Sequence, residues 1–226
     1  MPTLLITGAN RGIGLEFTRQ YAASGWDIIA CCRAPQEAEA LRAIGGRVSV
    51  EKLDVTDYAA VDALAAKLGS RPIDLLINNA GIYGTRNPAL SIGDPGEYLR
   101  VLQVNAVAPM KVTLSLLPNL KAAKTAKIAT LSSRMGSIGL GAGGSYVYRT
   151  SKAAINAAMH NLALDLQSSG ITCILLHPGW VKTDMGGQGA DITTQQSVTG
   201  LKAVIDGASL SDTGKFFNYD GSEFPW

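Results

Sequence analysis

The stretch that decides the fold is Thr7-Gly8-Ala9-Asn10-Arg11-Gly12-Ile13-Gly14, which follows a short apolar run at Thr3–Thr7 and precedes a segment of helical spacing at Leu15–Ser24. A glycine-rich turn between a first strand and its helix lets the backbone approach a pyrophosphate, and the helix N-terminus adds partial positive charge. The G-x-x-x-G-x-G spacing departs from the G-x-G-x-x-G fingerprint, and the alternative is a tight structural turn. The strand–turn–helix context favours nucleotide binding. The residues expected to bind there are Gly8, Asn10, Arg11, Gly12, Ile13 and Gly14.

Short apolar runs alternate with longer stretches of helical spacing along the rest of the chain. Few polar residues interrupt the runs, which is typical of strands buried on both faces. The alternation predicts parallel strands joined by right-handed crossovers, and hence one α/β domain over residues 1–226 with a Rossmann-type doubly wound parallel sheet flanked by helices. The expected strands are Thr3–Thr7, Asp27–Cys32, Val48–Leu53, Leu75–Asn78, Lys127–Leu131 and Ile171–His177. The expected helices are Leu15–Ser24, Pro35–Ala43, Tyr58–Leu68, Leu99–Leu117 and Tyr148–Ser168, and a further one starts at the capping box Thr193-Thr194-Gln195-Gln196.

Composition and charge exclude several classes of protein. Of the 226 residues, 46% are apolar and 17% are charged, which indicates a folded globular chain rather than a disordered one. The net charge is +2 and the charges are interspersed, so the sequence argues against a nucleic-acid partner. No apolar stretch approaches the ~18 residues that a membrane span needs, and no signal peptide precedes the first strand. We therefore expect a cytoplasmic protein that binds neither membrane nor nucleic acid.

The cysteines and histidines give no sign of a metal site. Cys31, Cys32 and Cys173 have neither ligand-like nor framework spacing, and buried reduced thiols suit the cytosol. Because adjacent strand residues point to opposite faces, Cys31 and Cys32 should lie on different sides of the sheet. Neither His160 nor His177 lies at helical or turn spacing from a second metal ligand, so both are expected to be structural.

The end of the second strand favours a phosphorylated dinucleotide. A fold that prefers NAD usually holds an acidic residue there, which bonds the ribose 2′-hydroxyl. This chain has Cys31-Cys32-Arg33 instead, and no acid appears until Glu37. Since arginine binds phosphate bidentately, Arg33 suits a 2′-phosphate, and Arg11 can approach the same group. Each arginine alone could be a solvated surface charge, but the pair without the acid favours NADP(H).

A tyrosine and a lysine four residues apart open one of the expected helices, in Tyr148-Arg149-Thr150-Ser151-Lys152. Residues at this spacing share a helix face, whereas Tyr146 lies six before Lys152 and would sit on another. A nearby ammonium should lower the pKa of Tyr148 from its usual value of about 10. Such a phenol can exchange a proton with a carbonyl oxygen. A Y-x-x-x-K pair on its own is usually just an exposed helix pair.

Several motifs occur together in a characteristic order. They are TGANRGIG at 7–14, Asp54-Val55, Asn78-Asn79-Ala80-Gly81, Ser133-x-x-Gly136, YRTSK at 148–152 and Pro178-Gly179. With them the chain resembles the short-chain dehydrogenase/reductase family over nearly its whole length. HPGWVKTDMGG at 177–187 and GKFFNYDGSEFPW at 214–226 are similar to the C-factor/Sniffer-type carbonyl reductases within that family.

The resemblance implies four catalytic residues. Tyr148 would be the acid/base, and Lys152 would lower its pKa and bind the nicotinamide ribose. Ser133 would hold the substrate oxygen; Ser132 competes for this role, but only Ser133 matches S-x-x-G and adjacent strand residues face opposite sides. Asn105 would anchor a proton-relay water, although a structural bond between helix and strand is the alternative.

The resemblance also implies further contacts with the cofactor. Asp54, followed by Val55, would contact adenine, unless it only closes a turn after a strand. The other residues expected to line the dinucleotide are Asn79, Ala80 and Gly81 on the adenosine side and Pro178, Gly179, Val181 and Thr183 around the nicotinamide, besides Tyr148 and Lys152. No metal is implied.

Together these features predict an NADP(H)-dependent oxidoreductase that transfers hydride between the nicotinamide and a carbonyl or alcohol substrate. The rival readings are an NADP(H)-binding regulatory protein with little or no turnover, and a structural protein on the same fold. The glycine-rich connection at 139–144 is longer than the family pattern and leaves the shape of the substrate mouth open. The long apolar helices from Leu99 and Tyr148 predict a homodimer, unless the segment Phe216–Trp226 covers one of them.

Overall fold

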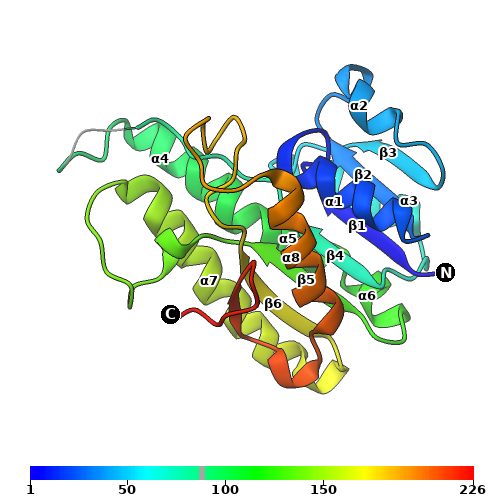
Figure 1. Ribbon diagram of the computed structural model, residues 1–226. Helices are drawn as coiled ribbons and strands as arrows, with labels where there is room; N and C mark the ends of the chain where they lie inside the picture. The colour runs from blue at the N-terminus through cyan, green and yellow to red at the C-terminus, as the bar shows by residue number, and fades with distance from the viewer. Residues whose placement is uncertain (87–89) are drawn as a thin grey trace.

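The computed structural model describes residues 1–86 and 90–226, and its centre is a seven-stranded parallel sheet (Figure 1). The strand order is β3-β2-β1-β4-β5-β6-β7. The strands are β1 (Thr3–Thr7), β2 (Asp27–Cys32), β3 (Val48–Lys52), β4 (Leu75–Asn78), β5 (Lys127–Leu131), β6 (Thr172–His177) and β7 (Phe216–Asn218). The order changes direction between β1 and β4, which is the switch point where open α/β sheets bind their ligands. The predicted doubly wound fold is confirmed.

Two edge strands depart from the sequence expectation. β7 was not expected, because Phe216–Asn218 is too short to stand out as an apolar run, yet it pairs with Leu175–His177 in parallel. β3 lies at the other edge, and none of its residues is fully buried. An edge strand has a neighbour on one side only, so its polar residues, such as Ser49 and Glu51, can reach solvent.

Helices cover both faces of the sheet. They are α1 (Gly12–Ala23), α2 (Glu39–Arg42), α3 (Tyr58–Leu68), α4 (Pro95–Leu102), α5 (Ala108–Ser115), α6 (Leu117–Ala122), α7 (Tyr146–Leu166) and α8 (Thr194–Gly207). Figure 1 shows α1 and α8 in front of the sheet, where their apolar residues form one core with β1 and β2. Residues of α3, α5 and α7 form a second core on the opposite face. As predicted, Cys31 and Cys32 lie in different cores, and both are buried and reduced.

The helix expected over Leu99–Leu117 was wrong as one continuous element. α4 passes into a π-helical turn at Gln103–Val107, α5 follows, and the helix breaks after Ser115. Pro118 lies in the first turn of α6 and lacks an amide hydrogen, so it cannot donate the hydrogen bond that would continue α5. The helix expected at Pro35–Ala43 is likewise a 3₁₀ turn, Pro35–Glu37, followed by the single turn of α2. The other 3₁₀ turns are Arg134–Gly136, Gln167–Ser169 and Leu210–Asp212.

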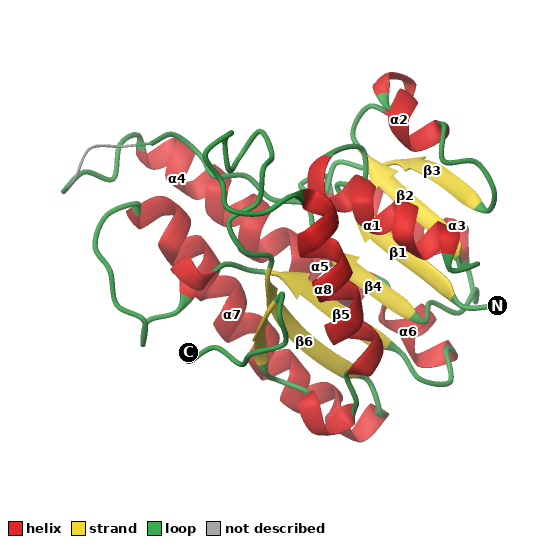
Figure 2. Cartoon of the chain, in the orientation of Figure 1, coloured by secondary structure: helices red, strands yellow, loops and turns green. Residues whose placement is uncertain are grey.

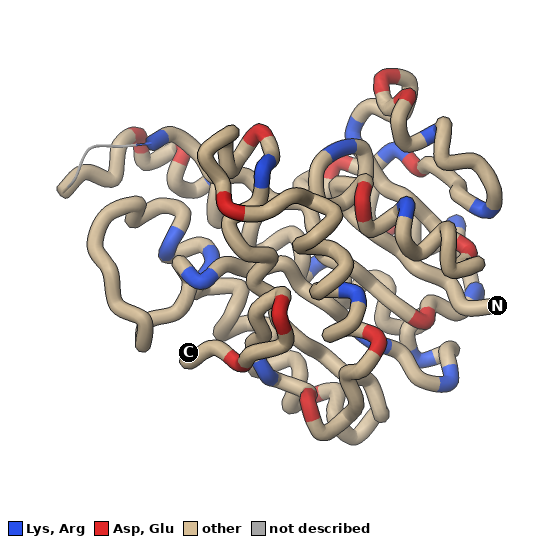
Figure 3. The backbone as a smooth tube through the Cα atoms, viewed as in Figure 1, with Lys and Arg blue, Asp and Glu red and all other residues tan. Residues whose placement is uncertain are grey.

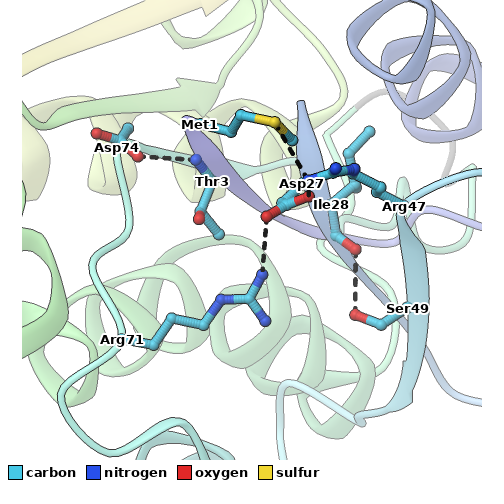
Figure 4. A network of polar contacts seen from close by, with 8 residues as sticks. All are labelled: Met1, Thr3, Asp27, Ile28, Arg47, Ser49, Arg71 and Asp74. Atoms are coloured by element: carbon cyan, nitrogen blue, oxygen red, sulfur yellow. Dashed lines mark hydrogen bonds and ion pairs between the residues drawn. The ribbon is translucent and has the colours of Figure 1, made fainter. Parts of the chain in front are cut away.

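Polar contacts tie the strands together at their amino ends (Figure 4). Asp74 accepts a hydrogen bond from the Thr3 amide at 2.7 Å, and the Asp27 carboxylate lies 3.4 Å from Arg47 and 3.8 Å from Arg71. Figure 2 shows the long loops gathering at the opposite end, toward which the strand arrows point. The carboxyl ends of the strands are therefore the place to look for a binding site.

The surface carries both signs of charge. Figure 3 shows the positions of lysine and arginine along the backbone interspersed with those of aspartate and glutamate. Within residues 1–86 and 90–226, no helix combines the length and apolar character that crossing a bilayer requires.

Candidate active site

The glycine turn after β1 forms the floor of the site. Gly8 has a φ of +66°, a left-handed conformation that a side chain would strain. A Cβ at Gly14 would lie 2.2 Å from the carbonyl oxygen of Gly8, so only glycine lets α1 pack this closely against the turn. Arg11 is the N-cap residue of α1 but makes no side-chain cap bond, and the first turn contains no acid. The amides at this helix end are thus available to an anionic group such as a pyrophosphate.

The loop after β4 holds the glycine turn in place. The Thr7 hydroxyl accepts from the amides of Asn79 and Ala80, both at 3.1 Å. The Asn79 side chain in turn donates to the carbonyls of Thr7 at 2.9 Å and Gly8 at 3.0 Å. Asn79 therefore joins the two loops on either side of the switch point. Gly81 follows at a position where a Cβ would lie 3.3 Å from Asn105 and 3.7 Å from Lys152, so this segment connects the nucleotide floor to the catalytic candidates.

Arg33 lies directly after β2, and its side chain is exposed. It has no hydrogen-bond or ion-pair partner among the described residues. Asp54 accepts from the hydroxyl of Thr56 at 2.7 Å and from its amide at 2.9 Å. These bonds, and the charge of Arg33 to a smaller degree, hold the pKa of Asp54 below its usual range. A positive and a negative side chain thus stand at the ends of β2 and β3, and Arg33 is free to bind an anion.

Arg11 pairs with Asp184 across the site. Both side chains are largely exposed, with 68% and 77% of their surface accessible, so the pair is weak and its partners can be exchanged for another charge. Asp184 belongs to the segment after Gly179, where Thr183 accepts from the amide of Gly186 at 3.1 Å. Arg11 must therefore break its ion pair with Asp184 before it can bind a phosphate.

The segment after β6 is held from the side of α8. The Pro178 carbonyl accepts from Ser197 at 2.6 Å, and Val181 forms a parallel bridge with Ile192. A Cβ on Gly179 would lie 2.6 Å from Ile192, which explains the glycine. Pro178, Gly179 and Val181 are thereby fixed at the carboxyl end of β6, where the resemblance places the nicotinamide.

The four catalytic candidates converge at the carboxyl ends of β4 and β5. Tyr148 and Lys152 lie in the first turns of α7, Ser133 follows β5, and Asn105 lies in the π-helical turn. All four are buried, with 8% or less of their surface exposed. The Lys152 Nζ atom lies 5.8 Å from the centroid of the Tyr148 ring and donates to the Leu131 carbonyl at 2.9 Å. The predicted i, i+4 approach of Tyr148 and Lys152 is therefore present.

The electrostatics of this pair differ from the sequence expectation. Burial raises the pKa of Tyr148 to about 12, partly opposed by a hydrogen bond with Ser133. Burial also lowers the pKa of Lys152 to about 8. The expected lowering of the tyrosine pKa by the ammonium is thus not found, because desolvation outweighs it and the ammonium is bonded to Leu131. Tyr148 stays protonated at neutral pH in this arrangement.

The two candidate serines, Ser132 and Ser133, lie in different surroundings, and so do Tyr146 and Tyr148. Ser132 donates to the side-chain Oδ1 of Asn156 at 2.5 Å inside the core, whereas Ser133 lies on the side of Tyr148 and caps the following 3₁₀ turn by accepting from the Met135 amide at 3.2 Å. Tyr146 is 36% exposed, while Tyr148 is buried. Ser133 and Tyr148 are therefore the members of each pair that face one another.

Asn105 makes three bonds through its side chain. Its Oδ1 atom accepts from the Ile82 amide at 2.9 Å, and its Nδ2 group donates to the Ile82 carbonyl at 2.8 Å and to the Ser151 hydroxyl at 3.0 Å. The structural bond that the sequence offered as the alternative role of Asn105 is therefore present, and it joins the π-helical turn to the loop after β4 and to α7. The π-helical turn around Asn105 is a feature that often marks functional sites.

A cavity beside Tyr148 was missed by sequence reasoning. Its volume is about 240 Å³, and its lining residues are Tyr83, Thr85, Arg86, Ser145, Tyr146, Val147 and Tyr148. The Tyr83 ring stacks on Tyr148 with centroids 4.5 Å apart and planes 21° apart. No local pattern could have revealed this contact, because the two residues are brought together only by the fold.

The histidines and the C-terminal segment pack around the far side of α7. His160 contacts the Trp226 ring and the carbonyl of Gly214, and His177 packs against Phe224. Burial lowers the pKa of His177 to about 4, so it is neutral. In the part of the chain that the structure describes, no group of three or more histidine, cysteine, aspartate or glutamate side chains could hold a metal ion.

Comparison with known sequences gives relatives over most or all of the chain. A family model described as short chain dehydrogenase matches residues 2–214. The C-signal protein of Myxococcus xanthus is 43% identical over 165 residues, which are 73% of this chain and 99% of that protein. The 1-hydroxy-2-glutathionyl-2-methyl-3-butene dehydrogenase of Rhodococcus is 34% identical over 234 residues and is covered completely, as is this chain.

Solved structures agree with these relatives. The carbonyl reductase Sniffer of D. melanogaster is 34% identical, with a TM-score of 0.93 over 100% of both chains. The NADPH-bound carbonyl reductase from chicken fatty liver is 35% identical, with a TM-score of 0.92 over 100% of this chain and 99% of the other. The resemblance to C-factor/Sniffer-type carbonyl reductases expected from the motifs is confirmed.

Proposed function

Because the chain belongs to the short-chain dehydrogenase/reductase family of oxidoreductases, we propose that it is an NADP(H)-dependent carbonyl reductase acting on small carbonyl or alcohol substrates. The observation that carries the proposal is the convergence of Tyr148, Lys152, Ser133 and Asn105 beside a cavity at the switch point of the sheet. A buried lysine without an acidic partner is costly, which makes a purely structural role for this cluster a poor explanation.

The cofactor proposal rests on the free amides of α1 and on Arg33. NADP(H), when bound, supplies the hydride, and the protein positions it. The glycine turn and the first amides of α1 would hold the pyrophosphate. Arg33, which has no hydrogen-bond or ion-pair partner among the described residues, would bind the 2′-phosphate, joined by Arg11 once it leaves Asp184. One of the similar solved structures carries NADPH, in agreement with this choice.

Proton transfer falls to the Tyr148 hydroxyl. In reduction it donates its proton to the carbonyl oxygen, which Ser133 orients by a second hydrogen bond. Tyr148 is protonated at neutral pH, as donation to a carbonyl oxygen requires, and burial raises its pKa further. Lys152 lies within reach to supply positive charge and a bond to the nicotinamide ribose.

Asn105 is proposed to bind a water molecule of a proton relay, using the acceptor atoms that take no part in its side-chain hydrogen bonds. Both hydrogens of its Nδ2 group are engaged, by Ile82 and Ser151. A relay water would therefore bind the remaining lone pair of Oδ1 or the main-chain carbonyl. In a π-helical turn the regular i, i+4 bonding is shifted, so carbonyl groups there can accept from other donors.

A regulatory NADP(H)-binding protein is the second candidate, since one relative is named a signal. Sensing a nucleotide requires none of the four catalytic candidates, so their joint presence favours turnover.

We place the protein in the cytoplasm, because all three cysteines are reduced and buried. We also propose a homodimer, which is taken up below.

Incubating the purified protein with NADPH and a panel of small aldehydes and ketones tests the proposal. We expect loss of NADPH absorbance matched by formation of the alcohol. Binding of NADPH without consumption on any member of the panel would support the regulatory candidate. Failure to bind NADPH at all would refute the cofactor assignment.

A further inference from the structure

We propose that the substrate of this site carries a carboxylate in addition to its carbonyl group, and that Arg86 binds this carboxylate. The inference rests on the proposed reductase function and narrows its substrate class. It follows from the walls of the cavity next to Tyr148, which combine one cation with aromatic and hydroxyl groups and contain no acidic residue.

Arg86 is joined to the catalytic candidates by a column of stacked groups. The Tyr83 ring stacks on Tyr148, and the Arg86 guanidinium carbon lies 4.8 Å from the centroid of the Tyr83 ring. The cation therefore stands one aromatic ring away from the proposed proton donor. A substrate whose carbonyl reaches the Tyr148 hydroxyl can extend along this column to the guanidinium.

Tyr83 is held in this position from the other side of the cavity. Its hydroxyl lies 2.9 Å from the hydroxyl of Ser145, the residue that precedes α7. Ser145 has a φ of +47°, one of two positive φ values among the described residues other than glycine. Strained backbone of this kind persists where the surroundings require it and is concentrated at functional sites. The ring that carries Arg86 is thus fixed against the start of the catalytic helix.

The charge of Arg86 is not neutralised by the protein. Its only polar contact among the described residues is a long one, 3.5 Å, to the Met185 carbonyl. The nearby acid Glu97 is taken by Arg100, which binds it with two hydrogen bonds of 2.8 and 2.9 Å. Stacking on Tyr83 orients the guanidinium but leaves its charge available, and a planar guanidinium pairs bidentately with a carboxylate.

The size of the cavity suits a small substrate. At about 240 Å³ it lies just below the usual range for ligand pockets, roughly 300–1,000 Å³. The hydroxyl groups of Thr85, Ser145 and Tyr146 can donate to a carboxylate oxygen from the same walls. A short aromatic or aliphatic oxo acid fits this combination of volume, aromatic surface and single cation.

The test compares 4-carboxybenzaldehyde with methyl 4-formylbenzoate, in which the carboxylate is esterified. The quantity measured is the ratio of kcat/KM for the acid to that for the ester, in the wild type and in Arg86→Gln. The two aldehydes differ in intrinsic reactivity, but this difference is the same for both enzymes and cancels when their ratios are compared. We expect the ratio to fall about tenfold in Arg86→Gln, mainly through KM for the acid, since a charge-assisted bond is lost.

Arg71→Gln is the matched control, because it removes the same charge from an arginine that lies at the amino ends of the strands and does not line the cavity. Its ratio should stay within about twofold of the wild type. An equal ratio in wild type and Arg86→Gln, with both aldehydes reduced, would overturn the carboxylate proposal while leaving the reductase function intact. If the wild type reduces other members of the panel but not 4-carboxybenzaldehyde, the carboxylate proposal is wrong, whereas reduction of no carbonyl compound at all would refute the reductase function itself.

Discussion

The Asn105 side chain binds both main-chain polar groups of Ile82, accepting from its amide at 2.9 Å and donating to its carbonyl at 2.8 Å. This amide-to-backbone pairing fixes the loop after β4 against the π-helical turn. A third bond, to Ser151, extends it to α7 one residue before Lys152. The end of α7 that carries Tyr148 and Lys152 and the loop proposed to face the cofactor are therefore positioned by the same side chain.

Replacing Asn105 with alanine should weaken the fold as well as the activity. The change leaves the partly buried amide and carbonyl of Ile82 without their partner, which costs about 1–3 kcal/mol for each group that stays unsatisfied, while Ser151 keeps its bond to the Tyr148 carbonyl. Chemical denaturation measures the loss in the free energy of unfolding. Gln103→Ala is the control, because Gln103 lies in the same turn and its side chain has no hydrogen-bond partner among residues 1–86 and 90–226. Equal stability of the two variants would contradict the bridging role.

Arg33→Asp should shrink or reverse a preference for NADPH over NADH. The change removes the proposed contact with the 2′-phosphate and adds a repulsion. Dissociation constants of both cofactors, measured by fluorescence titration, report the effect directly. Lys124→Asp changes the charge by the same amount, on an exposed turn before β5 at the amino ends of the strands, and should leave the preference intact. A wild type that binds both cofactors equally would remove the basis of the assignment.

Lys152→Met should abolish turnover and yet stabilise the folded protein at neutral pH. Folding lowers the lysine pKa from 10.5 to about 8, so below pH 8 the wild type must bury an ammonium. This cost is relieved as the pH rises from about 8 to 10.5, because the lysine then becomes neutral in the unfolded chain as well. The variant should therefore exceed the wild type by up to about 3 kcal/mol at pH 7 and by much less near pH 10. Thermal unfolding at the two pH values checks this, and an advantage that grows with pH would contradict it.

How much the sequence could predict depends on the range of the contacts. The glycine turn and the Tyr148–Lys152 pair are local patterns, and both could be placed from spacing alone. The π-helical turn at Asn105 could not, because Asn105 is held there by bonds to Ile82 and Ser151, which lie in other segments of the chain. The stack of Tyr83 on Tyr148 depends on two crossovers of the sheet. The pKa of Tyr148 was expected to fall and instead rises, because burial cannot be judged from a motif.

The homodimer is a prediction from exposed apolar side chains. Leu99, Val107, Leu114 and Leu164 are each 49% to 67% exposed on α4, the π-helical turn, α5 and α7. The C-terminal segment covers part of α7 through the contact between Trp226 and His160, but Leu164 in the next turn remains open to solvent. An isologous pairing of these helices would cover them. Light scattering at micromolar concentration should give about twice 23.6 kDa, whereas a mass near 23.6 kDa would refute the dimer.

The most direct test of the central claim is the turnover of Tyr148→Phe with NADPH and a carbonyl substrate that the wild type reduces. The change removes only the phenolic hydroxyl, so NADPH affinity should stay close to that of the wild type while kcat falls by about 10²-fold or more. Tyr98→Phe is the matched control, since the Tyr98 hydroxyl bonds Thr150 on α7 outside the cavity. Loss of turnover in Tyr148→Phe alone, with NADPH still bound, is the result expected. Wild-type turnover in Tyr148→Phe would contradict the mechanism.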